Sequence, residues 1–330
     1  MTSKHFLLWC AGGFIAALAV ILPLNIRADI YGLFRPAKGR ILGIYGEERI
    51  AKYLQSFRYV PENFNGVLLG SSTSSILDTR EFLGYRVYNA SIQGGNIEDL
   101  KPIAENIFRN GELKLTVLCL HRYLTNDHAR KTDFITPKQY WGALGSPQLM
   151  NAYVSKIAID LGLVPNKYDE YGTIHLASDL DMETVKRNIA DAVEGIERGT
   201  ASTGNYYVDP VALAGLQDML TMARRHSRRM LIFYPPLPAP ILAIRSAEYA
   251  RYRAITAMLL TPEDIVVDFN DQGYEKLRAD PTNFVDAVHL SRAGARRVIS
   301  ELAAAASQSI GSAESVRART MTAGAAELTR

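Results

Sequence analysis

Between residues 65 and 300, short apolar runs alternate with longer stretches in which apolar residues recur every three or four positions. Stretches such as Ile97–Asn110 and Pro210–Arg225 have the spacing of amphipathic helices. The runs are rich in apolar and β-branched residues, as is usual for strands buried on both faces of a sheet. The predicted strands are Val67–Leu69, Arg86–Asn89, Leu115–Leu120, Met230–Tyr234 and Ile265–Phe269. Strands separated by helices predict an α/β fold with a doubly wound, mostly parallel five-stranded sheet flanked by helices.

A long interval, residues 121–206, separates the third and fourth predicted strands. A structureless loop of this length is uncommon inside a domain, and helical patterns such as "LMNAYVSKIAIDLG" occur within it. We therefore predict a partly helical insertion packed over the carboxyl edge of the sheet. Its aromatic residues either form a platform for stacking sugars or, as we favour, the insertion's own small core. These residues are Tyr140, Trp141, Tyr153, Tyr168 and Tyr171.

The N-terminus carries an apolar run without a charge, from Phe6 to Ile26. A helix needs about 20 such residues to cross a bilayer, whereas the core of a signal peptide has about 7–15. We predict an uncleaved anchor, with a signal cleaved near Ala28 as the alternative. The chain then divides into the anchor at residues 1–26, a partly helical juxtamembrane segment at 27–64, the sheet domain at 65–307 and a frayed tail at 308–330.

The sequence indicates less directly on which side of the membrane the domain lies. Basic residues follow the span, and taken literally the positive-inside rule places the domain in the cytoplasm. Long domains, however, translocate largely regardless of charge. We predict a single-pass protein of the inner (cytoplasmic) membrane whose domain is periplasmic or extracellular, with a cytosol-facing anchored hydrolase as the alternative. The basic residues are Arg27, Arg35, Lys38 and Arg40.

Composition excludes several classes of protein. A net charge of +3 and the lack of a basic stripe argue against nucleic-acid binding. The two cysteines, Cys10 and Cys119, lie in the apolar tract and in a predicted strand, so neither a disulfide framework nor a cysteine metal site is predicted. The histidines lack the spacing of metal ligands. We therefore predict no metal and no cofactor.

Three segments that follow predicted strands carry candidate chemistry, because ligands of doubly wound folds bind at the carboxyl ends of the strands. After the first strand come Gly70 and a run of hydroxyl residues from Ser71 to Ser75. A serine at such a turn can be a nucleophile beside backbone N–H groups. Taken alone, the run is better explained as a helix cap. No lysine follows the glycine, so a phosphate-binding P-loop is disfavoured.

The other two segments are equally ambiguous in isolation. After the second strand, "NASIQGG" contains Gly94, at which the backbone can approach a ligand closely or simply turn. After the fifth strand, Asp286 and His289 are three residues apart. A carboxylate and an imidazole at this spacing can form the orienter and base that a serine nucleophile requires. The same pair is equally well explained as a surface aspartate beside a partly buried histidine.

Taken together, the three segments resemble the SGNH (GDSL-type) esterase superfamily. "LLGSS" is similar to the Gly-Asp-Ser block, with Ser71 in the aspartate place and Ser72 in the nucleophile place. "NASIQGG" resembles the second block, and "DAVHLSRAG" the last. The resemblance implies an SGNH-hydrolase-like fold with Ser72, Asp286 and His289 as catalytic residues. It also implies that the backbone N–H groups of Ser72 and Gly94 stabilise an oxyanion.

The third block departs from the family pattern. Members with a full set carry Gly-x-Asn-Asp after the third strand, and its asparagine is an oxyanion donor. Here the chain reads "VLCLHRYLTND", with Tyr123 near the matching place and Asn126 a few residues later. We predict Asn126 as the remaining oxyanion donor, and Tyr123 and Trp141 as substrate-binding residues. His121, which ends the third run, is within reach of the same site, although a lone histidine there is more often an edge residue.

With this departure and its N-terminal span, the chain resembles a membrane-anchored branch of SGNH-like proteins that modify cell-surface polymers. Examples are the alginate O-acetylation and teichoic acid D-alanylation proteins. The resemblance implies serine-dependent acyl-ester chemistry, as an O-acyltransferase or esterase, on a cell-surface or exported polysaccharide. It also implies a membrane protein that donates the acyl group as a partner. The alternative is a catalytically inactive scaffold or glycan-binding subunit of a polysaccharide assembly complex.

Overall fold

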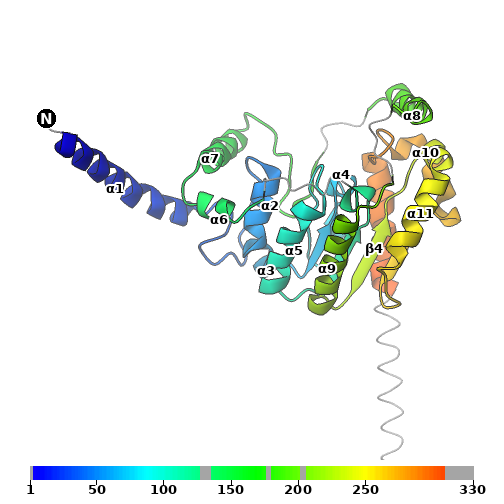
Figure 1. Ribbon diagram of the computed structural model, residues 1–330, viewed down its shortest axis with the longest axis horizontal. Helices are drawn as coiled ribbons and strands as arrows, with labels where there is room; N and C mark the ends of the chain where they lie inside the picture. Colours follow the sequence, from blue (N-terminus) through cyan, green and yellow to red (C-terminus); the bar gives the residue numbers. More distant parts are fainter. Residues whose placement is uncertain (1–2, 127–134, 176–179, 201–205, 309–330) are drawn as a thin grey trace, which may run out of the picture.

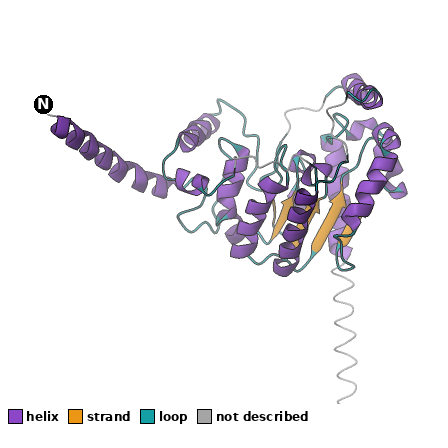
Figure 2. Ribbon diagram, viewed as in Figure 1, coloured by secondary structure: helices purple, strands orange, loops and turns teal. Residues whose placement is uncertain are grey.

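The computed structural model describes residues 3–126, 135–175, 180–200 and 206–308. Its centre is a parallel five-stranded sheet of order β2-β1-β3-β4-β5 with helices on both faces (Figure 2). The strands are β1 Gly66–Leu69, β2 Val87–Asn89, β3 Leu115–Cys119, β4 Met230–Tyr234 and β5 Ile265–Asp268. The sequence prediction of the five strands is confirmed, with each end within one residue of the observed one. All four strand pairings are parallel.

Helices follow the strands as the apolar spacing predicted, and α5 has the predicted bounds. It begins at a capping box, in which the Asn96 side chain accepts from the Asp99 N–H and Asp99 accepts from the Asn96 N–H. The helices of the sheet domain are α2 Glu48–Ser56, α3 Tyr59–Asn63, α4 Ser72–Ser75, α5 Ile97–Asn110, α9 Pro210–His226, α10 Ala239–Ile244, α11 Ser246–Ala257, α12 Glu275–Ala279 and a last helix over residues 292–308. Short 3₁₀ turns are η1 Thr79–Glu81, η2 Arg122–Leu124, η4 Gln272–Tyr274 and η5 Pro281–Asn283.

The sheet separates two apolar clusters, because successive residues of a strand point to opposite faces. In β1, Val67 and Leu69 pack with α2, α3, α5 and α9, whereas Leu68 packs with α10, α12 and the last helix. Every β1 residue is buried, as its apolar run predicted. The segment at 27–64 contributes residues such as Ile30 and Tyr59 to the first cluster, so it is packed onto the sheet domain.

Helix α1, Ser3–Ala28, projects from the domain as a single long rod (Figure 1). It is long and apolar enough to span a membrane, a property that signal sequences share, and none of its most apolar window is buried. Its end is tied to the domain. Asn25 Nδ2 donates to the Leu144 carbonyl oxygen at 2.6 Å, and the Tyr153 hydroxyl donates to Asn25 Oδ1 at 3.0 Å. Asp29, with φ of 42°, then accepts from the N–H groups of the following turn.

The described part of the insertion is partly helical, with α6 Lys138–Gly142, α7 Pro147–Asp160 and α8 Met182–Glu197. A segment around residues 168–175 runs beside β2, where the Asn89 N–H donates to the Tyr171 carbonyl oxygen at 2.7 Å. Four of the five aromatic residues, all except Trp141, pack against the first apolar cluster, so they join a core shared with the sheet domain and not a separate core of the insertion. Residues 127–134, 176–179 and 201–205 of the insertion, and the predicted tail from 309 onward, lie outside the described residues.

Candidate functional site

The strand order reverses beside β1, because β2 lies on one side of it and β3, β4 and β5 follow on the other. In doubly wound sheets this switch point opens a crevice at the carboxyl ends of the strands. Ser72, the first residue of α4, follows β1 here, and His121 follows β3. The contact between Thr73 Oγ1 and Cys119 Sγ, at 3.4 Å, holds these two ends together. The fold therefore places the hydroxyl run at the edge where ligands of such sheets bind.

The five hydroxyl groups after β1 have different partners, and Ser72 alone reaches a histidine among the bonds found in the described residues. Ser72 Oγ lies 2.9 Å from His289 Nε2. Ser71 Oγ contacts Thr73 Oγ1, and although Ser71 occupies the N-cap position, its side chain makes no capping bond. Ser74 contacts Ser91 Oγ at 2.8 Å, and Ser75 donates to the Ser72 carbonyl oxygen at 2.9 Å. The cap interpretation therefore does not describe the Ser71 side chain.

His289 lies between Ser72 and a carboxylate. His289 Nδ1 is 2.8 Å from Asp286 Oδ2, while Asp286 Oδ1 accepts from the N–H groups of Val288 and His289, both at 2.7 Å. These three hydrogen bonds hold the carboxylate in place, and the carboxylate in turn orients the imidazole toward the serine. Burial acts to raise the pKa of Asp286, but the hydrogen bonds from His289 and the two backbone groups outweigh it and hold the pKa below the ordinary carboxyl range. The carboxyl group is therefore ionised near neutral pH.

Gly94 lies in the turn after β2 and has a φ of 62°, in the left-handed region that favours glycine. The turn is joined to α4, because Ser91 Oγ contacts Ser74 Oγ. A Cβ atom added at Gly94 would lie 3.5 Å from Arg49 Nη2, which is an ordinary contact. The glycine is thus required by backbone conformation and not by crowding, and the structure places it on a loop fixed to the serine-bearing helix.

Two residues at the end of β3 have buried groups that the sequence analysis undervalued. His121 Nδ1 accepts from the Tyr123 N–H at 3.4 Å, so the proton of a neutral ring is on Nε2. Burial first, and the neighbouring Arg122 and His289 next, hold the pKa of His121 well below its usual range. His121 Nε2, Arg122 Nε and Arg122 Nη2 are buried without a hydrogen-bond partner among the described residues. The sequence marks His121 and Arg122 only as two polar residues directly after a predicted buried strand.

The remaining predicted residues have different surroundings. The Tyr123 ring packs edge-on against His121, and the Arg122 guanidinium lies 5.3 Å from its centroid. Asn126 is buried at the end of the same turn, and its role as an oxyanion donor stays a prediction. Trp141 is 68% exposed on α6. It lines a pocket with residues of α2 and α5, so the structure does not bring it beside Ser72.

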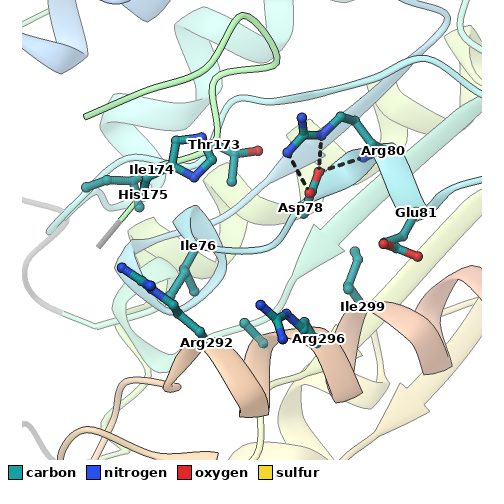
Figure 3. A pocket seen from close by; sticks show the side chains of 11 residues that line it. Ile76, Asp78, Arg80, Glu81, Thr173, Ile174, His175, Arg292, Arg296 and Ile299 are labelled. Carbon is teal, nitrogen blue, oxygen red and sulfur yellow. Dashed lines mark hydrogen bonds and ion pairs between the residues drawn. The ribbon is translucent and has the colours of Figure 1, made fainter. Parts of the chain in front are cut away.

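A pocket of about 420 Å³ lies between the turn after α4, the segment at 173–175 and the last helix, and its lining includes neither Ser72 nor His289 (Figure 3). Ile76, just after α4, and Arg292, three residues after His289, both line it. Its wall is largely charged. Arg292 and Arg296 come from the last helix, whereas Arg80 is paired with Asp78 through contacts of 2.7 and 2.8 Å. The lining residues are Ile76, Asp78, Arg80, Glu81, Thr173, Ile174, His175, Arg292, Ala295, Arg296 and Ile299.

No protein-family model matches the sequence, and no curated protein matches it. Among solved structures, the chain is similar to one from Streptococcus pneumonia described as "a putative platelet activating factor". That similarity has a TM-score of 0.41 and 11% sequence identity, and it covers 79% of this chain and 90% of the other. A similarity of this degree carries no argument about function, which therefore rests on the residues of the site.

Proposed function

We propose that this chain performs serine-dependent acyl-ester chemistry, as an esterase or O-acyltransferase of the SGNH type. The observation that carries the proposal is the pair of hydrogen bonds that joins Ser72 to His289 and His289 to Asp286, with lengths of 2.9 and 2.8 Å. These lengths lie within the range of about 2.6–3.2 Å expected between a nucleophile and its base. Residues 217 positions apart in the chain make the first of these contacts, so local sequence does not enforce it.

The proposed reaction has two steps. His289 Nε2 accepts the Ser72 hydroxyl proton while Ser72 Oγ attacks the ester carbonyl carbon, and Asp286 stabilises the imidazolium that forms. The backbone N–H groups of Ser72 and Gly94 stabilise the oxyanion. His289 then returns the proton to the alcohol that leaves, and an acyl-serine remains. In the second step His289 accepts the proton of the acceptor, whose oxygen attacks the acyl carbon. The bond from this carbon to Ser72 Oγ then breaks, and His289 returns the proton to Ser72 Oγ.

The acceptor determines the name of the activity. Water gives an esterase, and a sugar hydroxyl gives an O-acyltransferase. Helix α1 is long and apolar enough to hold the domain at a membrane, and the resemblance to the membrane-anchored branch implies a saccharide acceptor. We therefore propose a cell-surface or exported polysaccharide as the acceptor or substrate, a membrane protein as the acyl donor, and a domain on the outer side of the inner membrane.

A serine-directed fluorophosphonate tests the proposal against its main rival, an inactive scaffold or glycan-binding subunit. An activated serine attacks phosphorus in the way that it attacks a carbonyl carbon. We expect stoichiometric labelling of the purified full chain, with the adduct mapped by mass spectrometry to the peptide that contains Ser72. An unlabelled protein that still binds glycan would favour the scaffold. Labelling at a serine elsewhere would overturn the assignment.

Replacement of Gly94 by alanine tests the oxyanion role. A residue with a Cβ atom loses about 1 kcal/mol in the left-handed region, and the relaxation should displace the Gly94 N–H. We expect kcat for acetyl ester cleavage to fall on the order of 10-fold or more, since complete loss of such a donor costs about 10²–10³. Gly84 is the matched control, with a φ of 83° and open space around it, at the opposite end of β2. Equal losses of activity in Gly94→Ala and Gly84→Ala, at equal losses of stability, would contradict the role.

A further inference from the structure

Helix α7 has an exposed apolar face. Met150, Val154, Ile157 and Leu161 follow one another at intervals of four, three and four residues, so they lie on one side of the helix. Their exposed fractions are between 57% and 67%. We call these four residues the α7 outer face. Leu163 and Val164, just beyond the helix, are exposed as well. A contiguous apolar surface of this kind usually marks a contact with a partner or a membrane.

The opposite side of α7 is already packed on the domain. Leu149 and Ala152 are buried, and a Cβ atom added at Gly46 would lie 3.3 Å from Ala152. Lys156 Nζ lies 5.4 Å from the centroid of the Tyr45 ring. A helix at a protein–water boundary normally has a polar outer side. Because α7 is apolar on both sides, its composition fits a helix that is covered on both, by the domain and by a second apolar medium.

The position of α7 is set by the end of α1. Asn25, in the last turn of α1, accepts from Tyr153 of α7 at 3.0 Å and donates to Leu144, just before α7, at 2.6 Å. Figure 1 shows α6 and α7 beside the end of α1 at which the rod meets the domain. At the same level, the exposed Arg27 carbonyl oxygen accepts from the Arg35 guanidinium at 2.6 Å. Arginines at the end of an apolar span extend to the lipid headgroups.

We propose that the α7 outer face is immersed in the interfacial layer of the bilayer that α1 spans. A helix that lies in this layer has one apolar face buried at the boundary of headgroups and acyl chains, and the hydrogen bonds of Asn25 hold α7 at that depth. The bilayer is favoured over a protein partner because the hydrogen bonds of Asn25 hold the end of the exposed apolar α1 against the helix that carries the α7 outer face. The inference rests on α1 being membrane-embedded, which belongs to the proposed function.

A second attachment would change how the domain sits on the membrane. One helix alone lets a domain rotate about its axis, whereas α1 and α7 together define an orientation. The hydrogen-bonded set of Ser72, His289 and Asp286 would then face one fixed direction relative to the lipid surface. The same contact would also keep the domain associated with the membrane if α1 were removed.

Spin labels on the full chain in phospholipid nanodiscs test the inference. Nitroxides are placed at Val154→Cys or Ile157→Cys in a Cys10→Ser background. Burial raises the pKa of the Cys119 thiol to about 12, so this buried group should stay unlabelled. The matched control is Gln148→Cys, which is exposed on α7 but points away from the outer face. A label at Ile15→Cys, also exposed, reports separately whether α1 is inserted.

Collisions of the nitroxide with oxygen, which dissolves in lipid, and with a water-soluble nickel chelate give distinct outcomes. We expect labels at 154 and 157 to collide with oxygen and to be at least 5-fold less accessible to the chelate than the label at 148. High chelate accessibility at 154 and 157, with the label at 15 in lipid, would overturn the inference but leave the anchor intact. Low accessibility to both reagents would overturn it in favour of a second copy of the chain or another protein. A label at 15 exposed to the chelate would overturn both the anchor and the inference.

Discussion

Replacement of Ser72 by alanine is expected to lower kcat for a chromogenic acetyl ester about 10³-fold or more, because removal of the nucleophile of a serine–histidine pair eliminates the acyl-enzyme route. The substitution removes a single oxygen atom whose partner is His289 Nε2, at 2.9 Å. The backbone of α4 is held by other groups, such as the Asn89 side chain, which donates to the carbonyl oxygens of Ser74 and Leu77. Ser72→Ala should therefore unfold at the same urea concentration as the unmodified protein.

Ser75 provides the control for this experiment. It lies on the same short helix, and its hydroxyl donates to the Ser72 carbonyl oxygen and not to the histidine. We expect Ser75→Ala to retain ester cleavage within about 3-fold of the unmodified protein. Full activity in Ser72→Ala would remove Ser72 from the mechanism. If activity fell equally in both variants, the hydroxyl run would act through the conformation of α4, and the case for a nucleophile would be lost.

The strands and the candidate triad were accessible from sequence for two different reasons. A strand buried on both faces must be apolar along its length, so the apolar run Met230–Tyr234 predicts a strand without any tertiary information. Asp286 and His289 are three residues apart, and their contact is a local matter of turn geometry. The contact of His289 with Ser72 is not local. Its prediction rested on the resemblance of the three segments to the SGNH superfamily, and the physical reason for the contact is that parallel topology brings the carboxyl ends of separate strands to one edge.

Other features depend on packing that no local pattern encodes. The apolar residues of α7 gave a helix prediction, but which of its faces is covered by the domain depends on Gly46 and Asn25, more than 100 positions away. Trp141 was assigned to substrate as an aromatic residue of an insertion expected over the carboxyl edge of the sheet, yet it lines a pocket with residues of α2 and α5. His121 was discounted as a lone histidine. Its buried Nε2 and its proximity to His289 became visible only in three dimensions.

Replacement of Asp286 by asparagine is expected to reduce kcat about 10³–10⁴-fold with little change in KM, because it reverses the polarity of the contact at His289 Nδ1. An asparagine at this place can still accept from the N–H groups of Val288 and His289 through Oδ1, but its amide nitrogen then faces the imidazole. His289 Nδ1 must become the acceptor, and the proton moves to Nε2. In this tautomer Nε2 cannot accept the proton of Ser72.

Asp280→Asn is the matched control, since Asp280 also accepts from a nearby backbone N–H, that of Thr282, and lies outside the hydrogen-bonded set of Ser72. We expect Asp280→Asn to keep its kcat within about 3-fold of the unmodified protein. If Asp286→Asn retained full activity, His289 would not require its carboxylate, and the triad would be reduced to a pair at most.

The difference in stability between Asp286→Asn and the unmodified protein should depend on pH, and the pKa of Asp286 determines the direction of this dependence. The folded-state pKa lies below the ordinary carboxyl range, despite the opposing effect of burial, because His289 and two backbone groups donate to the carboxylate. Ionised Asp286 therefore stabilises the fold at pH values above its unfolded pKa of about 4, and this stabilisation disappears as the pH falls through the lower folded value. Urea unfolding should show Asp286→Asn to be less stable than the unmodified protein at pH 7. The difference should shrink as the pH is lowered below about 4, and a difference that grew on acidification would mean that the carboxylate is not held in the ionised form by His289.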